Sequence, residues 1–282
     1  MISFLKSFQD FFHYDFLLYA LIGQFVLSII CGLLSPIIIA KKFSFIGEGI
    51  SHSTLFGLAV ALSFFDYDSP LWVFAITLAI TLLNVAFLAR SSFRQGLPSD
   101  SIIGIFLTTS LALGVLIHHL FARGKADLLS FLFGNILLLG PIDLILLSLI
   151  LLVTIFFVCL RLKNWIYFCF DEEGATLAGL NTKRYHYGLF VLLGIVIVLS
   201  TKTAGTILAN SLLLVPGALA YKSANSMKQV FRHSVIFSMF TSLISMVFAN
   251  WKGLPPGATL ALTQFSMLFI ILGTLKVLKR FI

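Results

Sequence analysis

The chain has 282 residues, of which 59% are hydrophobic and only 11% are charged. Its mean hydropathy of +1.06 is too high for a water-soluble domain with a solvated polar surface. The net charge of +8 could indicate nucleic-acid binding, but the basic residues stand in small groups between apolar runs, where the positive-inside rule places them. The composition therefore predicts an all-α, polytopic transmembrane helical bundle, organised as a single domain over residues 1–282, with no nucleic-acid partner.

Nine apolar stretches come close to the roughly 20 residues that cross a bilayer as a helix. They are residues 16–40, 43–65, 70–89, 102–120, 142–160, 187–201, 204–221, 234–250 and 259–275. The sixth and seventh are short and are separated only by Lys202 and Thr203, which predicts a tight hairpin or helices that do not fully cross. Residues 1–15, ahead of the first span, are expected to form an interfacial segment.

The distribution of basic residues predicts the orientation of the chain. If the C-terminus is cytoplasmic, 14 of the 19 basic residues lie inside and five lie outside. The inner set is Lys41, Lys42, Arg90, Arg94, Arg161, Lys163, Lys183, Arg184, Lys222, Lys228, Arg232, Lys276, Lys279 and Arg280. This asymmetry predicts a cytoplasmic C-terminus and an external N-terminus.

The external loop at residues 121–141 is longer than a turn. Behind Asp127 it contains an apolar run, residues 128–139, that is too short to span the bilayer. We expect this run to form a half-helix, with Asp127 more suited to capping it than to binding metal.

The second span carries an ionisable pair. Glu48 and His52 are separated by four residues, so a helix places them on one face, with Ser44 and Ser51 beside them. Ionisable groups at membrane depth are costly unless they face protein or water, which favours a substrate or ion pathway. A structural Glu–His hydrogen bond between packed helices is the alternative that the spacing leaves open.

The chemistry of this pair suits a divalent metal. An imidazole nitrogen and a carboxylate oxygen are ligands for zinc, manganese and iron. The other histidines and carboxylates near spans, which are Asp100, His118, His119, Asp127 and Asp143, fall at or beyond the ends of those spans. A site with four ligands would therefore need weak oxygen ligands, or two copies of the chain meeting at a two-fold axis.

The seventh span contains three residues that could line a pore, Asn210, Ser211 and Pro216. A proline frees a backbone carbonyl inside the bilayer, and small polar residues offer hydrogen-bonding groups. The same residues are also ordinary helix-packing and kink devices, and the pattern does not decide between the two roles.

The internal loop is predicted to contain a short helix within residues 170–184. Asp171 is a suitable N-cap, Glu172 and Glu173 complement the positive end of the helix, and Gly179 followed by Leu180 is a good stop. A helix of two turns does not persist alone in water, so it must pack against the rest of the chain or against a partner.

Five motifs together resemble those of the zinc/manganese/iron permease family of ABC importers. They are GEGISH at 47–52, DLLSFLFG at 127–134, DEEGATLAGLN at 171–181, ANSLLLVP at 209–216 and LPPGA at 254–258. The resemblance covers nearly the whole chain. It implies a fold similar to the vitamin B12-type ABC importer permease and a location in the cytoplasmic (inner) membrane of a bacterium. It also implies two permeases working with two cytoplasmic ATP-binding subunits, and an extracytoplasmic protein that delivers the metal.

The resemblance also assigns roles to residues. Glu48 and His52 match the acidic and histidine positions of the family's translocation path, and residues 171–183, including Asn181, match the coupling helix that docks on the ATPase. The implied substrate is zinc or manganese, with iron as a further candidate, and no cofactor is permanently bound. This chain departs from the family in having Glu48 where aspartate is usual, a side chain that is one methylene longer.

Two other readings of the sequence remain. A proton- or ion-coupled secondary transporter would use Glu48 and His52 as a relay. An intramembrane enzyme would use them as metal ligands, but the sequence has no H-E-x-x-H motif. The sequence also has no G-x-x-x-x-G-K-[ST] loop, which agrees with a transport subunit, not an enzyme, whose ATPase lies on a separate chain.

The predicted topology can be tested by cysteine labelling in whole cells. Cysteines introduced singly at Asp68, Gly124 and Gly253 should react with an impermeant thiol reagent added outside, because these positions fall in external loops. A cysteine at Asn225 should stay unlabelled, and its labelling from outside would contradict the predicted topology.

Overall fold

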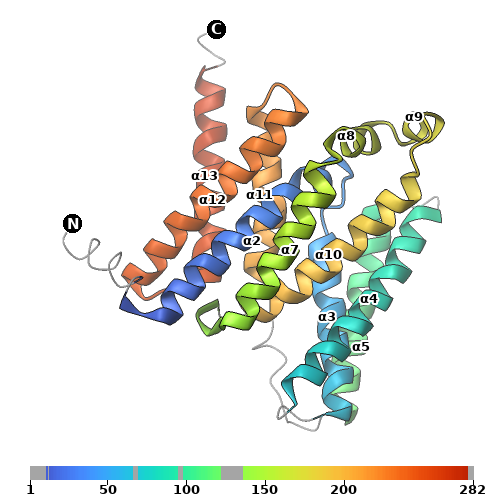
Figure 1. The fold of residues 1–282 in the computed structure, drawn as a ribbon, viewed down its shortest axis with the longest axis vertical. Helices are drawn as coiled ribbons and strands as arrows, with labels where there is room; N and C mark the ends of the chain where they lie inside the picture. Colours follow the sequence, from blue (N-terminus) through green and yellow to red (C-terminus); the bar gives the residue numbers. More distant parts are fainter. Residues whose placement is uncertain (1–10, 12, 66–68, 95–97, 122–135, 279–282) are drawn as a thin grey trace. The chain divides into compact units, whose positions relative to one another are not determined.

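The computed structural model describes residues 11, 13–65, 69–94, 98–121 and 136–278. Within these ranges the regular structure is helical (Figure 1). The elements are α2 (Asp15–Ala40), α3 (Ile46–Phe64), α4 (Pro70–Arg94), α5 (Ser99–Phe121), η1 (Ile136–Leu138), α7 (Pro141–Cys159), α8 (Leu162–Phe170), α9 (Glu172–Leu177), α10 (Thr182–Ala204), α11 (Thr206–Ser223), α12 (Met227–Lys252) and α13 (Pro256–Leu278).

The helices form two compact units, and the chain passes between the units four times. The first unit takes residues 1–39, 135–160 and 203–282, and the second takes residues 40–134 and 161–202. Thus α2, α7, α11, α12 and α13 belong to the first unit, while α3, α4, α5, α8, α9 and nearly all of α10 belong to the second. That the chain is a single permease domain stays a prediction.

In the first unit, α2 and α12 are joined by a ladder of serine hydroxyls. Serines four residues apart on α12 each donate to a backbone carbonyl of α2, from Ser234 to Gly32, Ser238 to Ser28 and Ser242 to Gln24. The first two bonds are 2.7 Å long and the third is 3.4 Å. In the opposite direction, the Gln24 side-chain amide Nε2 donates to the Ser242 carbonyl at 3.1 Å. The four-residue spacing keeps all of these donors on one helix face, so the pair is fixed in register.

Two prolines lie inside helices of this unit, at Pro36 of α2 and Pro216 of α11. A proline cannot donate to the carbonyl four residues before it, which for Pro36 is Gly32. The Ser234 hydroxyl of the ladder donates to this Gly32 carbonyl instead. Next to Pro216, the Gly217 amide donates to Ser35 Oγ at 2.7 Å. At Pro36 the freed carbonyl thus accepts from a hydroxyl of α12, and beside Pro216 a hydroxyl of α2 accepts a backbone N–H.

In the second unit, α3 packs closely against α4 and α5. A Cβ added at Gly57 would lie 2.8 Å from the carbonyl oxygen of Thr77 on α4. On α5, a Cβ at Gly114 would lie 3.2 Å from the backbone of Phe56. Glycine at these points allows the helix backbones to approach more closely than a side chain would permit. Close backbone contact with α4 and α5 therefore fixes the position of α3, the helix that carries Glu48 and His52.

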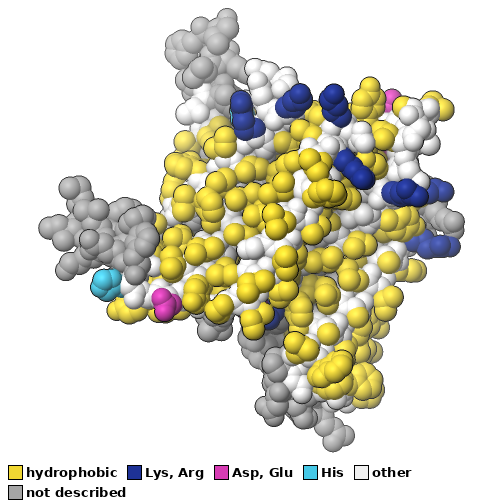
Figure 2. Space-filling view, in the orientation of Figure 1, with side chains coloured by type: hydrophobic (Ala, Val, Ile, Leu, Met, Phe, Trp, Pro, Cys, Tyr) yellow, Lys and Arg dark blue, Asp and Glu magenta, His cyan; other side chains and the backbone are white. Residues whose placement is uncertain are grey.

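Figure 2 shows hydrophobic side chains along the lengths of the helices and lysine and arginine side chains gathered near helix ends. Leu71, Leu83 and Ile142 each have 72% or more of their surface exposed. A water-soluble protein would not expose so much apolar surface, whereas a lipid-facing one must.

Each of the nine predicted spans coincides with a helix, but nine membrane crossings are not confirmed. Seven of the described helices are long and apolar enough to cross a membrane, and α3 and α11 are not among them. These two are also the helices that carry the candidate pathway residues. Their polar side chains and glycines lower the mean hydropathy of the segment.

The sixth span was predicted too short. Helix α10 has 23 residues, from Thr182 to Ala204, because helical bonding continues through Lys183 and Arg184, which an apolar count leaves out. The break before α11 is at Gly205, with φ +82°. The predicted interfacial segment at 1–15 and the half-helix behind Asp127 lie largely outside the described residues.

Gly217 offers a test of helix packing in the first unit. A Cβ there would meet the backbone carbon and oxygen of Ser35, both at 2.8 Å, and a backbone cannot turn aside. We expect Gly217→Ala to destabilise the protein by about 1–3 kcal/mol through overpacking. The measurement is thermal unfolding in detergent.

The matched control is Gly273→Ala in α13, where an added Cβ meets nothing within 4 Å. That variant should be as stable as the parent or more so, because alanine favours helix over glycine. Equal stability of the two variants would contradict the packing argument.

Candidate functional site

Glu48 and His52 lie on the same face of α3, as their spacing predicts. Glu48 is in the first turn of the helix and its side chain is 44% exposed, whereas the His52 side chain is 16% exposed. His52 Nε2 stands 3.6 Å from Glu48 Oε2. The two donor atoms therefore point to the same space.

This distance argues against a structural hydrogen bond between the two side chains. A contact at 3.6 Å is too long for one. His52 Nδ1 and the hydroxyl of neighbouring Ser51 are also buried with no hydrogen-bond partner among the described residues. A buried polar atom without a hydrogen-bond partner costs free energy, so these groups are suited to bind a water, an ion or another protein group.

The spacing of the two donors suits a shared ion. Nitrogen and oxygen donors bound to one transition metal at about 2.0–2.2 Å stand roughly 3–3.5 Å apart. The 3.6 Å gap needs only a small rotation of either side chain to reach that range. Among the described residues no group of three histidine, cysteine or carboxylate side chains stands ready to hold a metal. Helix α3 thus offers two ligands, not a complete site.

The three pore-lining candidates of α11 differ in their surroundings. Asn210 is 7% exposed, and its amide nitrogen and oxygen find no hydrogen-bond partner among the described residues. Ser211 donates its hydroxyl to the Leu208 carbonyl of its own helix at 2.9 Å. Pro216 is buried at the contact with α2. Of the three, Asn210 alone has the unsatisfied polar atoms that a pathway residue would offer.

Other acidic residues near helix ends have structural partners. Asp100 accepts the backbone N–H of Ser44 at 3.1 Å, and Asp143 accepts that of Gly140 at 3.2 Å at the start of α7. His118 and His119 lie in the last turn of α5. Asp127 lies outside the described residues.

The segment at residues 170–184, predicted to be cytoplasmic, has the predicted caps. Asp171 accepts the Gly174 N–H at 2.8 Å and caps α9, which carries Glu172 and Glu173 in its first turn. Gly179 has φ +84°, and the Leu180 N–H returns to the Ala175 carbonyl at 2.9 Å in a Schellman-type ending.

Asn181 has a role that the sequence did not predict. Its side chain accepts the Arg184 N–H at 3.2 Å, so it caps the start of α10. Asn181 thus fixes the point at which the chain leaves the segment after α9 and enters the next long helix.

The surface around α9 is open and bears an exposed leucine. Leu177, the last residue of the helix, is 90% exposed. Beside it is a cavity of about 650 Å³, lined by Phe93, Glu172, Glu173, Thr176, Leu177, Thr182 and Lys183. An apolar side chain so fully exposed next to an open hollow is typical of a docking surface.

Sequence reasoning missed two features of this region. Helix α8 precedes α9, with Trp165 and Phe168 buried, and its signal was the three- and four-residue spacing of apolar residues from Leu162 onward. His186 is 4% exposed, and its Nε2 lies 3.0 Å from the Ala89 carbonyl of α4. Its imidazole connects α10 to α4, a role that no local pattern indicates.

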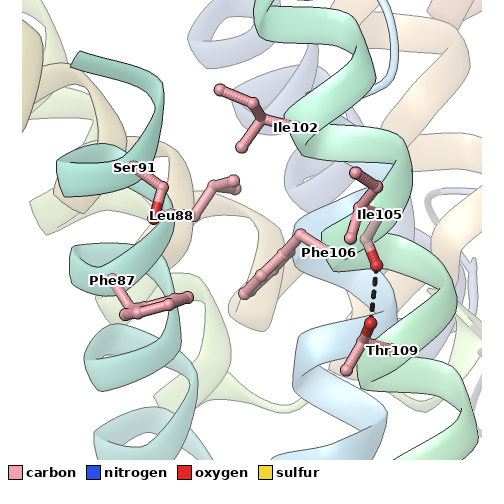
Figure 3. Close-up of a pocket in the computed structure, with 7 residues that line it drawn as sticks. All are labelled: Phe87, Leu88, Ser91, Ile102, Ile105, Phe106 and Thr109. Carbon is pink, nitrogen blue, oxygen red and sulfur yellow. Dashed lines mark hydrogen bonds between the residues drawn. The ribbon is translucent and has the colours of Figure 1, made fainter. Parts of the chain in front are cut away.

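A cavity between α4 and α5 is unsuited to metal. It measures about 230 Å³ and is lined by Phe87, Leu88, Ser91, Ile102, Ile105, Phe106 and Thr109 (Figure 3). The Thr109 hydroxyl donates to the Ile105 carbonyl of its own helix at 2.8 Å. None of these lining residues is a carboxylate, histidine or cysteine, so the cavity lacks strong metal ligands.

Comparison with known proteins decides the family. Residues 13–274 match the ABC 3 transport family. The chain belongs to this family. It is therefore the membrane-spanning permease subunit of an ABC transporter, a multi-pass protein of the bacterial cytoplasmic membrane, and ATP is hydrolysed on a separate subunit. The secondary-transporter and intramembrane-enzyme readings are set aside.

Similar proteins extend over the whole permease. The manganese transport system membrane protein MntC of Listeria monocytogenes is 31% identical over 91% of this chain and 90% of its own. The manganese import system permease protein ScaB of Streptococcus gordonii is 31% identical over 99% of this chain and 98% of its own.

Solved structures agree with the fold. PsaBC from Streptococcus pneumoniae in complex with Fab matches the permease with a TM-score of 0.80 and 29% identity, over 96% of this chain and 95% of that chain. An inward-facing metal-chelate type ABC transporter matches with a TM-score of 0.71 at 15% identity, over 92% of this chain and 86% of that one, which is a likeness of fold alone. The predicted ABC importer permease fold is confirmed.

Proposed function

We propose that this permease imports a divalent transition metal, with manganese or zinc as the cargo, along a path in which Glu48 and His52 contact the ion. The observation that carries the proposal is the paired face of α3. Two ligand atoms stand 3.6 Å apart without a hydrogen bond between them, beside a buried His52 nitrogen that has no partner among the described residues. This arrangement leaves both donor atoms available to an ion that passes along the path.

Manganese is the first candidate for the cargo. The relatives in Listeria monocytogenes and Streptococcus gordonii are named for manganese transport. A glutamate carboxylate with one imidazole is a harder ligand set than the thiolate-rich sites that favour zinc. Zinc remains compatible with the same two donors.

A second copy of the chain would complete the site. With two ligands per chain, a homodimer that brings two α3 helices to its axis supplies two carboxylates and two imidazoles. Asn210 of α11 stays a separate candidate for lining the pathway, because its amide is buried and has no partner among the described residues.

The permease also needs partners on each side of the membrane. The exposed Leu177 and the cavity beside α9 suit a cytoplasmic ATP-binding subunit that receives an apolar side chain with a charged rim around it. An extracytoplasmic metal-binding protein would deliver the ion at the opposite face. The metal is a substrate in this scheme, and no resident cofactor takes part.

Uptake of radioactive Mn²⁺ into vesicles that hold the whole transporter tests the pathway. We expect Glu48→Gln and His52→Ala each to lower uptake by at least about tenfold, because each removes a direct metal ligand without adding a charge. His119→Ala, at the exposed end of α5, is the matched control and should transport normally. Near-normal uptake by both ligand variants would demote the pair to a structural role.

A shorter carboxylate tests selectivity at the same site. Glu48→Asp should keep transport but change the competition between Zn²⁺ and Mn²⁺, since moving the carboxylate back by one methylene alters the size of the binding space. Unchanged competition would show that Glu48 does not select the ion.

A substitution at Gly179 tests whether α9 is the docking helix for the ATP-binding subunit. The Gly179 φ of +84° is unfavourable for a β-branched residue, although an added Cβ would meet nothing within 4 Å. Gly179→Val should therefore disturb the end of α9 by about 1–2 kcal/mol of backbone strain and lower ATP-driven uptake. Gly179→Asn, which tolerates this φ better, should retain more activity. Wild-type uptake by an assembled Gly179→Val transporter would contradict the coupling role.

A further inference from the structure

An ion pair joins α9 to the turn that precedes α3. Lys41 Nζ lies 2.6 Å from Glu172 Oε2, and the same ammonium stands 3.7 Å above the ring of Phe168 on α8. The Lys41 side chain is only 12% exposed, whereas that of Glu172 is 40% exposed. A lysine held by a carboxylate and an aromatic face, and largely shielded from water, is a firmer connection than an ordinary surface pair.

The two ends of this ion pair lie at functionally distinct places. Glu172 is the first residue of α9, the proposed docking helix. Lys41 stands in the turn that leads into α3, seven residues before Glu48. The pair therefore spans 131 positions of sequence to connect the docking helix with the start of the metal-binding helix.

The turn between Lys41 and α3 is held tightly, so a movement of Lys41 is passed on to the start of α3. Lys42 has φ +57°, a conformation that residues other than glycine rarely adopt. Phe43 is 3% exposed and packs edge-on against Phe190 of α10, with ring centroids 5.4 Å apart. The backbone N–H of Ser44 is bound by Asp100.

We propose that the Lys41–Glu172 pair carries movement of α9 to the first turn of α3, and so sets the position of Glu48 according to the state of the ATP-binding subunit. Lys41 is thus a positioning residue: it does not touch the metal and acts through Glu48. This inference rests on the proposed function, since it needs a metal path at Glu48 and an ATPase at α9.

The test is the number of Mn²⁺ ions transported for each ATP hydrolysed. It uses the complete transporter in vesicles, with its ATP-binding subunit and its binding protein. Lys41→Met and Glu172→Gln should each lower this ratio on the order of tenfold while ATP hydrolysis continues, as expected when a coupling interaction is lost. The double variant Lys41→Glu with Glu172→Lys should recover most of the ratio, and Lys41→Arg should keep it.

Lys163→Met is the matched control. Lys163 is an exposed lysine of α8 that makes no ion pair among the described residues, and its loss should leave the ratio unchanged. The amount of ATP-binding subunit that copurifies with each variant separates assembly from coupling. Should the single variants fail to assemble, the charge-swapped double variant and Lys41→Arg decide the question.

Each outcome bears on the proposal. It is wrong if assembled single variants transport with the wild-type ratio, or if the swapped pair assembles but stays as uncoupled as the single variants. A loss of assembled complex with a normal ratio in what remains would make the pair purely structural, which also overturns it. A wild-type transporter that hydrolyses ATP and moves no metal would instead remove the proposed function.

Discussion

The fold depends on how helices hold together in a solvent as apolar as their own side chains. Hydrocarbon gives little reward for burying leucine against leucine, so contact must come from close backbone approach and from hydrogen bonds between helices. The serine ladder from α12 to α2 supplies hydrogen bonds between helices. Gly57 and Gly217 allow the close backbone approach. Helix α3, with its candidate ligands, keeps its place in the second unit because glycines at two crossings let α4 and α5 approach it.

Much of the fold could be predicted from the sequence, because crossing a bilayer demands a length of apolar chain that is visible without a structure. Each of the nine predicted spans proved helical, and the caps at Asp171 and Gly179 followed from local chemistry. The start of α10 was missed because Lys183 and Arg184 are polar residues that the helix nevertheless includes. The ion pair of Lys41 with Glu172 was beyond reach, since only the fold brings together residues 131 positions apart.

The candidate site was predictable to the same extent. A four-residue spacing places Glu48 and His52 on one face of any helix, so helix geometry alone predicts that they lie together. Whether the two side chains satisfy each other is a matter of fractions of an ångström, and the 3.6 Å gap and the unpartnered His52 nitrogen appear only in three dimensions. The same holds for Asn210, whose burial without a partner distinguishes it from Ser211 beside it.

The ladder between α2 and α12 has a consequence for biosynthesis. Its bonds join residues more than 200 positions apart, so α2 enters the membrane long before α12 is made. At a translation rate of about 5–20 residues per second, that interval lasts roughly 10–40 s. During it the amide of Gln24 has no ladder partner, and an unsatisfied amide is poorly tolerated in hydrocarbon. Until the last third of the chain arrives, this amide has to find its hydrogen bonds in water or on its own helix.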